Sequence, residues 1–169
     1  SLLSDLVEIS RLGGKSQHIA ITSFYVDELL APLSKEFFLL TEQANLAFNY
    51  VKSSCIIETD QRLLRRVIQN FLSNAINYCP QTQRQGKVLL GVRRQQEHIV
   101  IEVWDNGPGI AKNKQQTIFK EFERLNETQE QPGLGLGLAI SDRIAKLLGL
   151  TISVKSMVGK GSCFSITLP

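Results

Sequence analysis

The pattern of apolar and polar residues along the chain predicts an amphipathic helix over residues 60–78. Its apolar positions recur at steps of one, three and four residues, as in a helix of about 3.6 residues per turn with one buried face. They are Leu63, Leu64, Val67, Ile68, Phe71, Leu72 and Ala75. Asp60 precedes this pattern and suits the N-cap position, because its carboxylate can accept hydrogen bonds from the first turn.

A second stripe of the same helix carries uncharged polar side chains at the edge of the apolar stripe. Asn70, Asn74, Asn77 and Tyr78 follow one another on consecutive turns, so three amides and a phenol line up. Such a stripe is either a solvated helix face or one wall of a site for an oxygen-rich ligand. This helix alone leaves both interpretations open.

Two more helices of the same kind are expected on either side of it. One covers residues 23–44, with a kink at Pro32 and a buried face formed by Val26, Leu29, Leu30, Leu33, Phe37 and Leu40. The other covers residues 138–148, with Ile140, Ile144, Leu147 and Leu148 facing inward. A short helix is expected over residues 111–119.

Strands are expected over residues 17–22, 46–51, 54–59, 86–94, 97–104, 151–156 and 162–168. The strands over 86–94 and 97–104 should form a hairpin through Gln95 and Gln96. This order of elements predicts one α/β (α+β) domain. We expect a two-layer sandwich in which helices cover one face of a mixed, largely antiparallel sheet.

The composition is that of one globular domain. The chain has 169 residues, 43% of them hydrophobic, which is enough for a substantial core. A net charge of +3 without a basic block gives no support for nucleic-acid binding, and no apolar run approaches the length of a membrane span. Cys55, Cys79 and Cys163 are widely spaced and form no CxxC pair, which argues against disulfides and zinc and suits a reducing cytosol.

Three glycine-containing segments follow the polar stripe. Residues 103–110 (VWDNGPGI) end an apolar run with an acid and a glycine turn. Residues 133–140 (GLGLGLAI) form a glycine-rich loop that opens a helix, and residues 159–162 (GKGS) precede the last strand. These are neither a GxxxxGK[ST] P-loop nor a GxGxxG fingerprint, so the folds that depend on those motifs lose their main support.

The residue types in these segments suit a purine nucleotide with a metal ion. A carboxylate at Asp105 accepts hydrogen bonds only, so it can pair with the exocyclic amine of adenine but repels the carbonyl oxygen of guanine. Asn70 and Asn74 offer carbonyl oxygens one turn apart for magnesium or its waters. The glycines of residues 133–137 leave backbone N–H groups open to phosphates. The competing interpretations are an Asp105 that serves only its turn and glycines used only for packing.

In this order and spacing the chain resembles the ATP-binding catalytic domain of sensor histidine kinases, within the GHKL ATPase superfamily. Residues 70–78 resemble the N-box, 103–110 and 133–140 the two glycine boxes, and 159–162 the final Gly-x-Gly-Ser/Thr motif. Residues 118–124, with Ile118, Phe119, Phe122 and Arg124, resemble the phenylalanine box. The resemblance spans nearly the whole chain and implies the Bergerat ATP-binding fold, with ATP and Mg²⁺ as ligands.

The resemblance also implies roles for individual residues. Asp105 should read adenine, Asn74 should bind the metal with Asn70 nearby, and Tyr78 should pack near the base. Residues 107–133 are expected to form a lid over the phosphates, anchored by Phe119 and Phe122. The implied catalytic residues are Asn70, Asn74 and Arg124. The implied nucleotide-binding residues are Asn74, Asn77, Tyr78, Asp105, Gly107, Gly109, Ile110, Phe119, Gly133, Leu134, Gly135, Leu136, Gly137, Leu138 and Ser162.

Two positions bear on the reaction. The chaperone, gyrase and mismatch-repair ATPases of this superfamily usually carry Glu at the position of Asn70, and an amide cannot act as a general base. We therefore expect a protein-histidine kinase, which keeps its γ-phosphoryl group for a partner histidine. The family commonly has Lys or Arg at the position of Asn77, so weaker nucleotide binding or slower transfer is expected here unless Lys120 or Arg124 neutralises phosphate instead. The alternative is a weakly active or inactive nucleotide-binding regulatory module.

The remaining residues suit a piece of a longer two-component sensor kinase. Residues 1–14 resemble the end of the dimerisation and phosphotransfer helix, and residues 15–169 the catalytic domain. The implied partners are that phosphotransfer domain and a response-regulator receiver domain, in a homodimeric parent. The domain is expected in the cytoplasm, and membrane anchoring of the parent stays open. His18, in the strand over 17–22, and His98, between two strands, lack the following acid of a phosphoacceptor and are expected to be structural or surface residues.

Overall fold

The computed structural model describes residues 18–79, 84–119 and 134–169. Its largest element is a five-stranded sheet in the order β2, β4, β5, β7, β6. These strands are β2 (Ala47–Tyr50), β4 (Lys87–Gln95), β5 (His98–Asp105), β7 (Gly161–Leu168) and β6 (Thr151–Met157). β2 runs parallel to β4, and the other pairs in this sheet are antiparallel. A second, two-stranded antiparallel sheet joins β1 (Ile21–Tyr25) to β3 (Ile56–Asp60).

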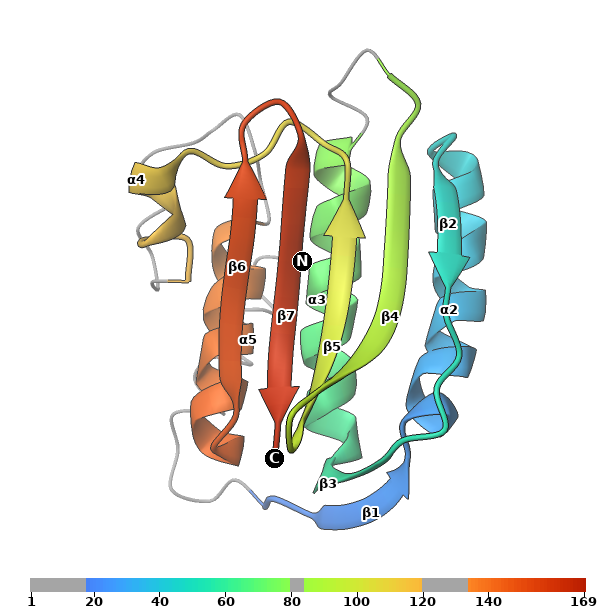
Figure 1. Cartoon of the computed structure of the whole chain (residues 1–169), viewed down its shortest axis with the longest axis vertical. Helices are drawn as coiled ribbons and strands as arrows, with labels where there is room; N and C mark the ends of the chain where they lie inside the picture. Colours follow the sequence, from blue (N-terminus) through green and yellow to red (C-terminus); the bar gives the residue numbers. More distant parts are fainter. Residues whose placement is uncertain (1–17, 80–83, 120–133) are drawn as a thin grey trace.

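The helices form a second layer on one face of the large sheet. Figure 1 shows α2 (Val26–Gln43), α3 (Gln61–Tyr78) and α5 (Leu134–Leu148) behind the strands, with the short α4 (Lys112–Gln115) beside the end of β6. The predicted two-layer sandwich with a mixed, largely antiparallel sheet is therefore confirmed. Within the described residues, the structure has no helix that is both long and apolar enough to span a membrane.

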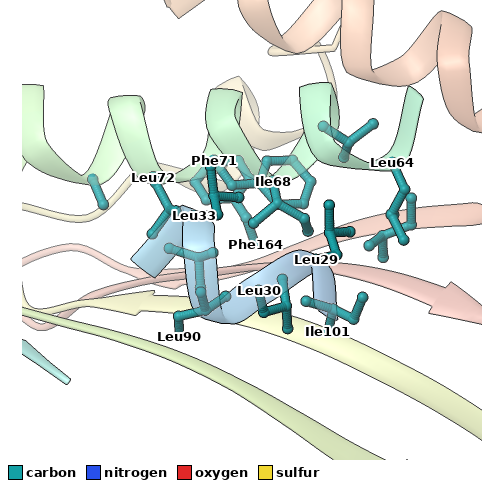
Figure 2. Packing of buried hydrophobic residues seen from close by; sticks show 14 of the residues in the cluster. Leu29, Leu30, Leu33, Leu64, Ile68, Phe71, Leu72, Leu90, Ile101 and Phe164 are labelled. Carbon is teal, nitrogen blue, oxygen red and sulfur yellow. The ribbon is translucent and has the colours of Figure 1, made fainter. Parts of the chain in front are cut away.

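Alternate residues of the strands point toward the helices and form one hydrophobic core. Val103 of β5 pairs with Phe164 of β7 in the sheet, and both side chains are buried. The ring centroid of Phe164 lies 5.5 Å from that of Phe71 in α3. Figure 2 shows how leucines from α2 and α3 surround these rings, among them Leu29, Leu33, Leu64 and Leu72. Every apolar position predicted for α3 is buried, and each such side chain stabilises the fold by about 1.5–3 kcal/mol.

The N-cap predicted for α3 is also confirmed. The Oδ1 atom of Asp60 accepts a hydrogen bond of 3.0 Å from the backbone N–H of Leu63. The Oδ2 atom accepts a second bond of 2.9 Å from the N–H of Ala20, just before β1. A cap of this kind contributes about 1 kcal/mol. One carboxylate thus defines where β3 ends and α3 begins, and with it the position of the polar stripe along the helix.

Some predicted boundaries in the N-terminal half are wrong. The helix predicted over residues 23–44 begins only at Val26, because residues 21–25 pair with β3 as strand β1. Leu40 is 44% exposed, and Thr41 takes its place on the buried face because the inward positions fall four residues after Phe37. The helix is continuous through Pro32. His18 is exposed and precedes β1 rather than lying in a strand.

Other boundaries shift in the C-terminal half. The hairpin turns at Gln96, which has a positive φ of 56°, and at the following residue, so that His98 is the first residue of β5. The helix predicted over 111–119 is limited to Lys112–Gln115. The last helix begins at Leu134, so the glycine segment that was expected to be a loop is already helical there. Leu147 is exposed, because the inward positions of α5 recur every four residues at 140, 144 and 148.

Candidate functional site

Four elements bring the predicted site residues to one end of the molecule. α3 and β5 both end there, while α5 and β7 both begin there (Figure 1). Asp105, the last residue of β5, pairs with Val88 of β4 and Ser162 of β7. A Cβ atom on Gly107 would lie 3.3 Å from the Cα atom of Cys79, the residue after α3. The glycine turn after β5 therefore packs directly against the polar end of α3.

The partly buried carboxylate of Asp105 lies at the site and accepts a hydrogen bond from the turn that follows it. Its Oδ1 accepts a 2.8 Å hydrogen bond from the backbone N–H of Gly107, and the backbone N–H of Ser162 also donates to the carboxylate. Burial raises the pKa of Asp105 above its ordinary value, and the two N–H groups oppose part of that rise. Asp105 thus serves its turn, as one interpretation expected. A carboxylate has about four acceptor positions, so capacity for an adenine amine remains.

Asn106 was not among the predicted site residues, yet its side chain makes three hydrogen bonds around this turn. Its Oδ1 accepts hydrogen bonds from the N–H of Lys87 at 2.7 Å and from the Sγ–H of Cys79 at 3.1 Å. Its Nδ2 donates to the carbonyl oxygen of Gln85 at 2.9 Å. Asn106 therefore fixes the turn to the loop before β4. Its place between Asp105 and Gly107 was a signal for this role.

The other predicted residues of the turn are fastened to the hairpin between β6 and β7. Gly109 has a φ of 78°, and a side chain there would collide with the backbone of Met157. The N–H of Ile110 donates to Ser156 Oγ at 2.7 Å. Ser156 Oγ also lies 2.7 Å from Ser162 Oγ. The structure thus brings Ile110 and Ser162 together through Ser156, which carried no signal in the sequence.

The polar stripe of α3 is divided between the interior and the surface. Asn70 is 8% exposed and Asn74 is 5% exposed, whereas Asn77 is exposed and Tyr78 is half-buried. The Nδ2 atom of Asn70 donates to the carbonyl oxygen of Gly137 at 2.9 Å and to Ser141 Oγ at 3.1 Å, both in α5. Asn70 therefore joins α3 to the glycine segment, and the solvated-face interpretation fails for the two buried amides.

Asn74 differs from Asn70 because its Nδ2 atom is buried and has no hydrogen-bond partner among the residues that the structure describes. Leaving a buried donor unpaired costs about 1–3 kcal/mol, so such groups are rare in folded proteins. The oxygen and nitrogen of an Asn side chain can exchange by a flip, so either atom can face the site. Asn74 is therefore the residue in this site whose polar group most needs a ligand.

The start of α5 and the segment after α4 supply the remaining described positions. A Cβ atom on Gly137 would contact Asn70 at an ordinary 3.7 Å, so close packing does not by itself require this glycine. Leu138 is fully buried in the core. Phe119 is half-buried and packs edge-on against Phe164, with ring centroids 6.2 Å apart.

Several predicted residues fall outside what the structure describes. Arg124 and Gly133 lie outside the described residues, as do Lys120 and Phe122 and with them most of the predicted lid. The side chains of Leu134, Gly135 and Leu136 are likewise not described. Among the residues that are described, no three His, Cys, Asp or Glu side chains gather in a metal-binding group.

A family model described as "Histidine kinase-, DNA gyrase B-, and HSP90-like ATPase" matches residues 59–169. The chain belongs to this ATPase family. The matched region starts just before α3 and contains the buried amides, the Asp105 turn and α5. Similar proteins include the adaptive-response sensory kinase SasA of Crocosphaera subtropica, 34% identical over 99% of this chain and 44% of that protein. The sensor protein KdpD of Escherichia coli is 39% identical over 68% of this chain and 12% of that protein.

Solved structures of histidine kinases have the same fold as this member of the ATPase family. Full-length ShkA in complex with AMPPNP matches with a TM-score of 0.84 and 24% identity, over 99% of this chain and 35% of that one. A nucleotide-free catalytic domain of ThkA matches with a TM-score of 0.75 and 24% identity, over 89% of this chain and 95% of that domain. The chain spans less than half the length of the curated relatives that it matches.

Proposed function

We propose that this domain binds Mg-ATP and donates the γ-phosphoryl group to a histidine of a phosphotransfer domain. The observation that carries the proposal is the buried, unpartnered amide of Asn74, on the helix that ends beside the Asp105 turn. An acceptor oxygen of a phosphate or of a metal-bound water would supply the partner that Nδ2 lacks, and after a flip of the amide its oxygen could bind a cation at the same place. Membership in an ATPase family and similarity to sensor kinases support ATP as that ligand.

Asp105 is proposed to recognise the adenine base. Its carboxylate is oriented by the N–H groups of Gly107 and Ser162, so it does not have to reorganise when the base binds. A further hydrogen bond from the adenine amine to this charged group contributes about 1.5–3 kcal/mol, whereas the guanine oxygen is repelled. Tyr78, half-buried at the end of α3, is proposed to pack near the base. We therefore expect ATP to bind at least about tenfold more tightly than GTP.

Asn74 is proposed as the magnesium ligand of the protein. Its hard amide oxygen suits this ion, which keeps most of its waters and shares the phosphates of a nucleotide. Bound magnesium would neutralise charge on the phosphates. Asn74 contributes an oxygen without adding a negative charge beside the triphosphate. The phosphates themselves are proposed to lie at the start of α5, where the first backbone N–H groups of a helix have no partners within the helix.

Transfer is favoured over hydrolysis by the position of Asn70. An amide cannot remove a proton from water, and this one already donates to Gly137 and Ser141 of α5. Asn70 therefore joins the metal-binding helix to the phosphate-binding helix instead of activating water. Phosphoryl transfer depends mainly on positioning and charge neutralisation, which such an arrangement can supply once an imidazole reaches the γ-phosphate.

The domain boundaries and partners follow from the same proposal. We assign residues 15–169 to the catalytic domain and residues 1–14 to the end of the phosphotransfer helix. ThkA, whose fold is similar, has been solved in complex with the response regulator TrrA. A receiver domain of that kind is the proposed downstream partner here, and the parent protein is proposed to be a homodimer.

A second candidate function is a nucleotide-binding regulatory module with little kinase activity. The observation in its favour is Asn77, which is exposed at the position where the family commonly carries Lys or Arg. An amide gives a triphosphate much less electrostatic stabilisation than a cation does. In this case the domain would bind ATP weakly and would not transfer phosphate.

Two measurements separate the candidates. The domain is first titrated with a fluorescent ATP analogue with and without magnesium, and we expect binding that needs the ion. It is then mixed with a matching phosphotransfer domain and radiolabelled ATP, with a variant lacking the acceptor histidine as the control. Label on the histidine supports the kinase, and no label at saturating ATP supports the regulatory module. No binding of ATP at all would contradict both.

A further inference from the structure

Arg84 lies outside every motif of the sequence, yet it binds three main-chain carbonyl oxygens. Its Nη2 atom donates to the oxygens of Asn106, Gly159 and Lys160, each at 2.9 Å. Its Nε atom donates to the oxygen of Asn106 at 3.2 Å. Asn106 belongs to the turn after β5, whereas the other two residues belong to the turn between β6 and β7. One side chain therefore ties two turns together.

The N–H groups that bond to the carboxylate of Asp105 lie in the first of these turns and just after the second. Asn106 is followed directly by Gly107, and Lys160 lies two residues before Ser162. The N–H groups of Gly107 and Ser162 both donate to Asp105. A movement of either turn would displace one of these donors. By holding these two turns, Arg84 also holds the two main-chain N–H groups that bond to the Asp105 carboxylate.

Arg84 is itself held in place by the side chain of Asn106. The Nδ2 atom of Asn106 donates to the carbonyl oxygen of Gln85, and its Oδ1 accepts from the N–H of Lys87 at 2.7 Å. The segment that carries Arg84 is therefore fastened to the residue whose carbonyl Arg84 binds. These reciprocal bonds join the loop before β4 and the turn after β5 into one unit.

The geometry of these bonds suits an arginine, in which Nη2 shares its two hydrogens among three oxygens while Nε bonds one of these oxygens again. A guanidinium presents five N–H donors in a planar, fixed arrangement, so it can serve several carbonyl oxygens with defined directions. A lysine ammonium is a compact point charge on a flexible stem and does not impose the same geometry. Charge-assisted hydrogen bonds are also about twice as strong as neutral ones, which compensates for the exposure of Arg84 to solvent.

We propose that Arg84 is a positioning residue for adenine recognition, holding the turns around Asn106 and Lys160 so that the Asp105 carboxylate keeps its orientation. This inference rests on the proposed role of Asp105 in binding ATP. It adds a specificity determinant from a loop that no nucleotide-binding motif includes. Loss of Arg84 should therefore reduce the preference for adenine as well as the affinity.

The test compares Arg84→Gln with the wild-type domain and with Arg62→Gln as a matched control. Arg62 is an exposed arginine in the first turn of α3, at the opposite end of that helix. ATP and GTP affinities are measured by calorimetry with magnesium, and thermal unfolding is recorded for each variant. Exchange of the Gly107 and Ser162 amide hydrogens is measured by NMR without nucleotide.

We expect Arg84→Gln to bind ATP about fivefold more weakly, with little change in GTP affinity, while the control resembles the wild type. The Gly107 and Ser162 amides should exchange about tenfold faster. A purely structural arginine would lower the unfolding temperature without changing the ratio of ATP to GTP affinity, and that result would overturn the inference. Unchanged amide exchange in Arg84→Gln would overturn it as well.

The conservative variant and the nucleotide-free measurement keep the test decisive. Arg84→Lys should recover only part of the ATP preference, and if Arg84→Gln does not fold, Arg84→Lys gives the same readouts. Full recovery of the ATP preference in Arg84→Lys would contradict the need for the planar arrangement of guanidinium donors. If the wild type and Arg62→Gln both fail to bind ATP, the proposed function is wrong. In that case the amide exchange of Gly107 and Ser162 still decides whether Arg84 positions Asp105.

Discussion

The turn after β5 and the polar end of α3 face the same site, but they satisfy their polar groups to different degrees. In the turn, Asp105 accepts from two backbone N–H groups, and both side-chain polar atoms of Asn106 are hydrogen-bonded. In α3, the buried Nδ2 atom of Asn74 has no partner. The side proposed to bind the base, formed by Asp105 and Asn106, thus has its polar groups satisfied before a ligand binds. The side proposed to bind the metal, formed by Asn74, does not. We call them the base side and the metal side.

Under the proposed function, this difference separates the residues that select the base from those that respond to ligand binding. A turn that is already rigid can discriminate between bases, because little freedom is lost when the base binds. An unpartnered amide lowers the stability of the free domain, and a ligand that satisfies it regains that free energy on binding. The metal side therefore couples nucleotide binding to folding stability more strongly than the base side does.

The largest effect is expected at Gly161, which has a φ of 136° and packs against the backbone of Asp105 and Asn106. A Cβ atom there would overlap the carbonyl oxygen of Asp105, so Gly161→Ala should lower the free energy of unfolding by roughly 3 kcal/mol. Gly149→Ala is the control, because Gly149 has a φ of 69° but no atom within 4 Å of an added Cβ. Urea unfolding measures both. Equal losses would contradict tight packing of the base side.

Asp105→Asn should separate binding from stability on the base side. The variant keeps an oxygen for the N–H of Gly107 but loses the acceptor for adenine, so affinity for ATP should fall at least tenfold, or about 1.4 kcal/mol. The free energy of unfolding should not fall comparably, because a buried charge is removed. Calorimetry and thermal unfolding report the two quantities. An unchanged ATP affinity would remove Asp105 from the site.

The two amides of α3 should respond in opposite ways to the same substitution. Asn74→Leu removes an unpartnered donor, so the nucleotide-free domain should gain about 1 kcal/mol while magnesium-dependent binding of ATP is lost. Asn70→Leu removes a donor that serves Gly137 and Ser141, so the domain should lose about 1 kcal/mol. Urea unfolding without nucleotide measures both changes. A loss of stability in both variants would contradict the view that Asn74 is unpartnered while Asn70 is satisfied.

Local patterns predicted most of the fold because they report short-range physics. The 3.6-residue period identified the buried face of α3, and Asp60 marked its first turn, because a cap bonds to a residue only three positions away. The turn role of Asp105 could be predicted for the same reason, since its partner Gly107 is two residues on. The start of α2 could not be predicted in this way, because residues 21–25 form a strand only by pairing with β3, more than thirty residues later.

The parts of the site that escaped prediction depend on contacts between distant segments. Nothing beside Ser156 in the sequence indicates that it will bond to Ile110, and nothing beside Arg84 indicates carbonyl oxygens of the hairpin between β6 and β7. The orphaned amide of Asn74 is also a tertiary property. The stripe pattern treated Asn70 and Asn74 alike, and only the packing of α5 gives one of them partners.

The smallest effect is expected from pH, and it examines the charge state of the base side. Because burial raises the pKa of Asp105, the folded domain holds this proton more tightly than the unfolded chain. This group therefore favours folding at low pH, and the contribution is lost as pH rises through the folded pKa.

Adenine binding needs the opposite form, since only the carboxylate is a pure acceptor. Affinity for ADP should thus fall on acidification, and it should begin to fall at a higher pH than that at which an ordinary aspartic acid titrates. The nucleotide titrates in the same range, so Asp105→Asn serves as the control. The expected result is a ratio of wild-type to variant affinity that shrinks severalfold on acidification. A ratio that stays constant on acidification would mean that the carboxylate of Asp105 does not bind adenine.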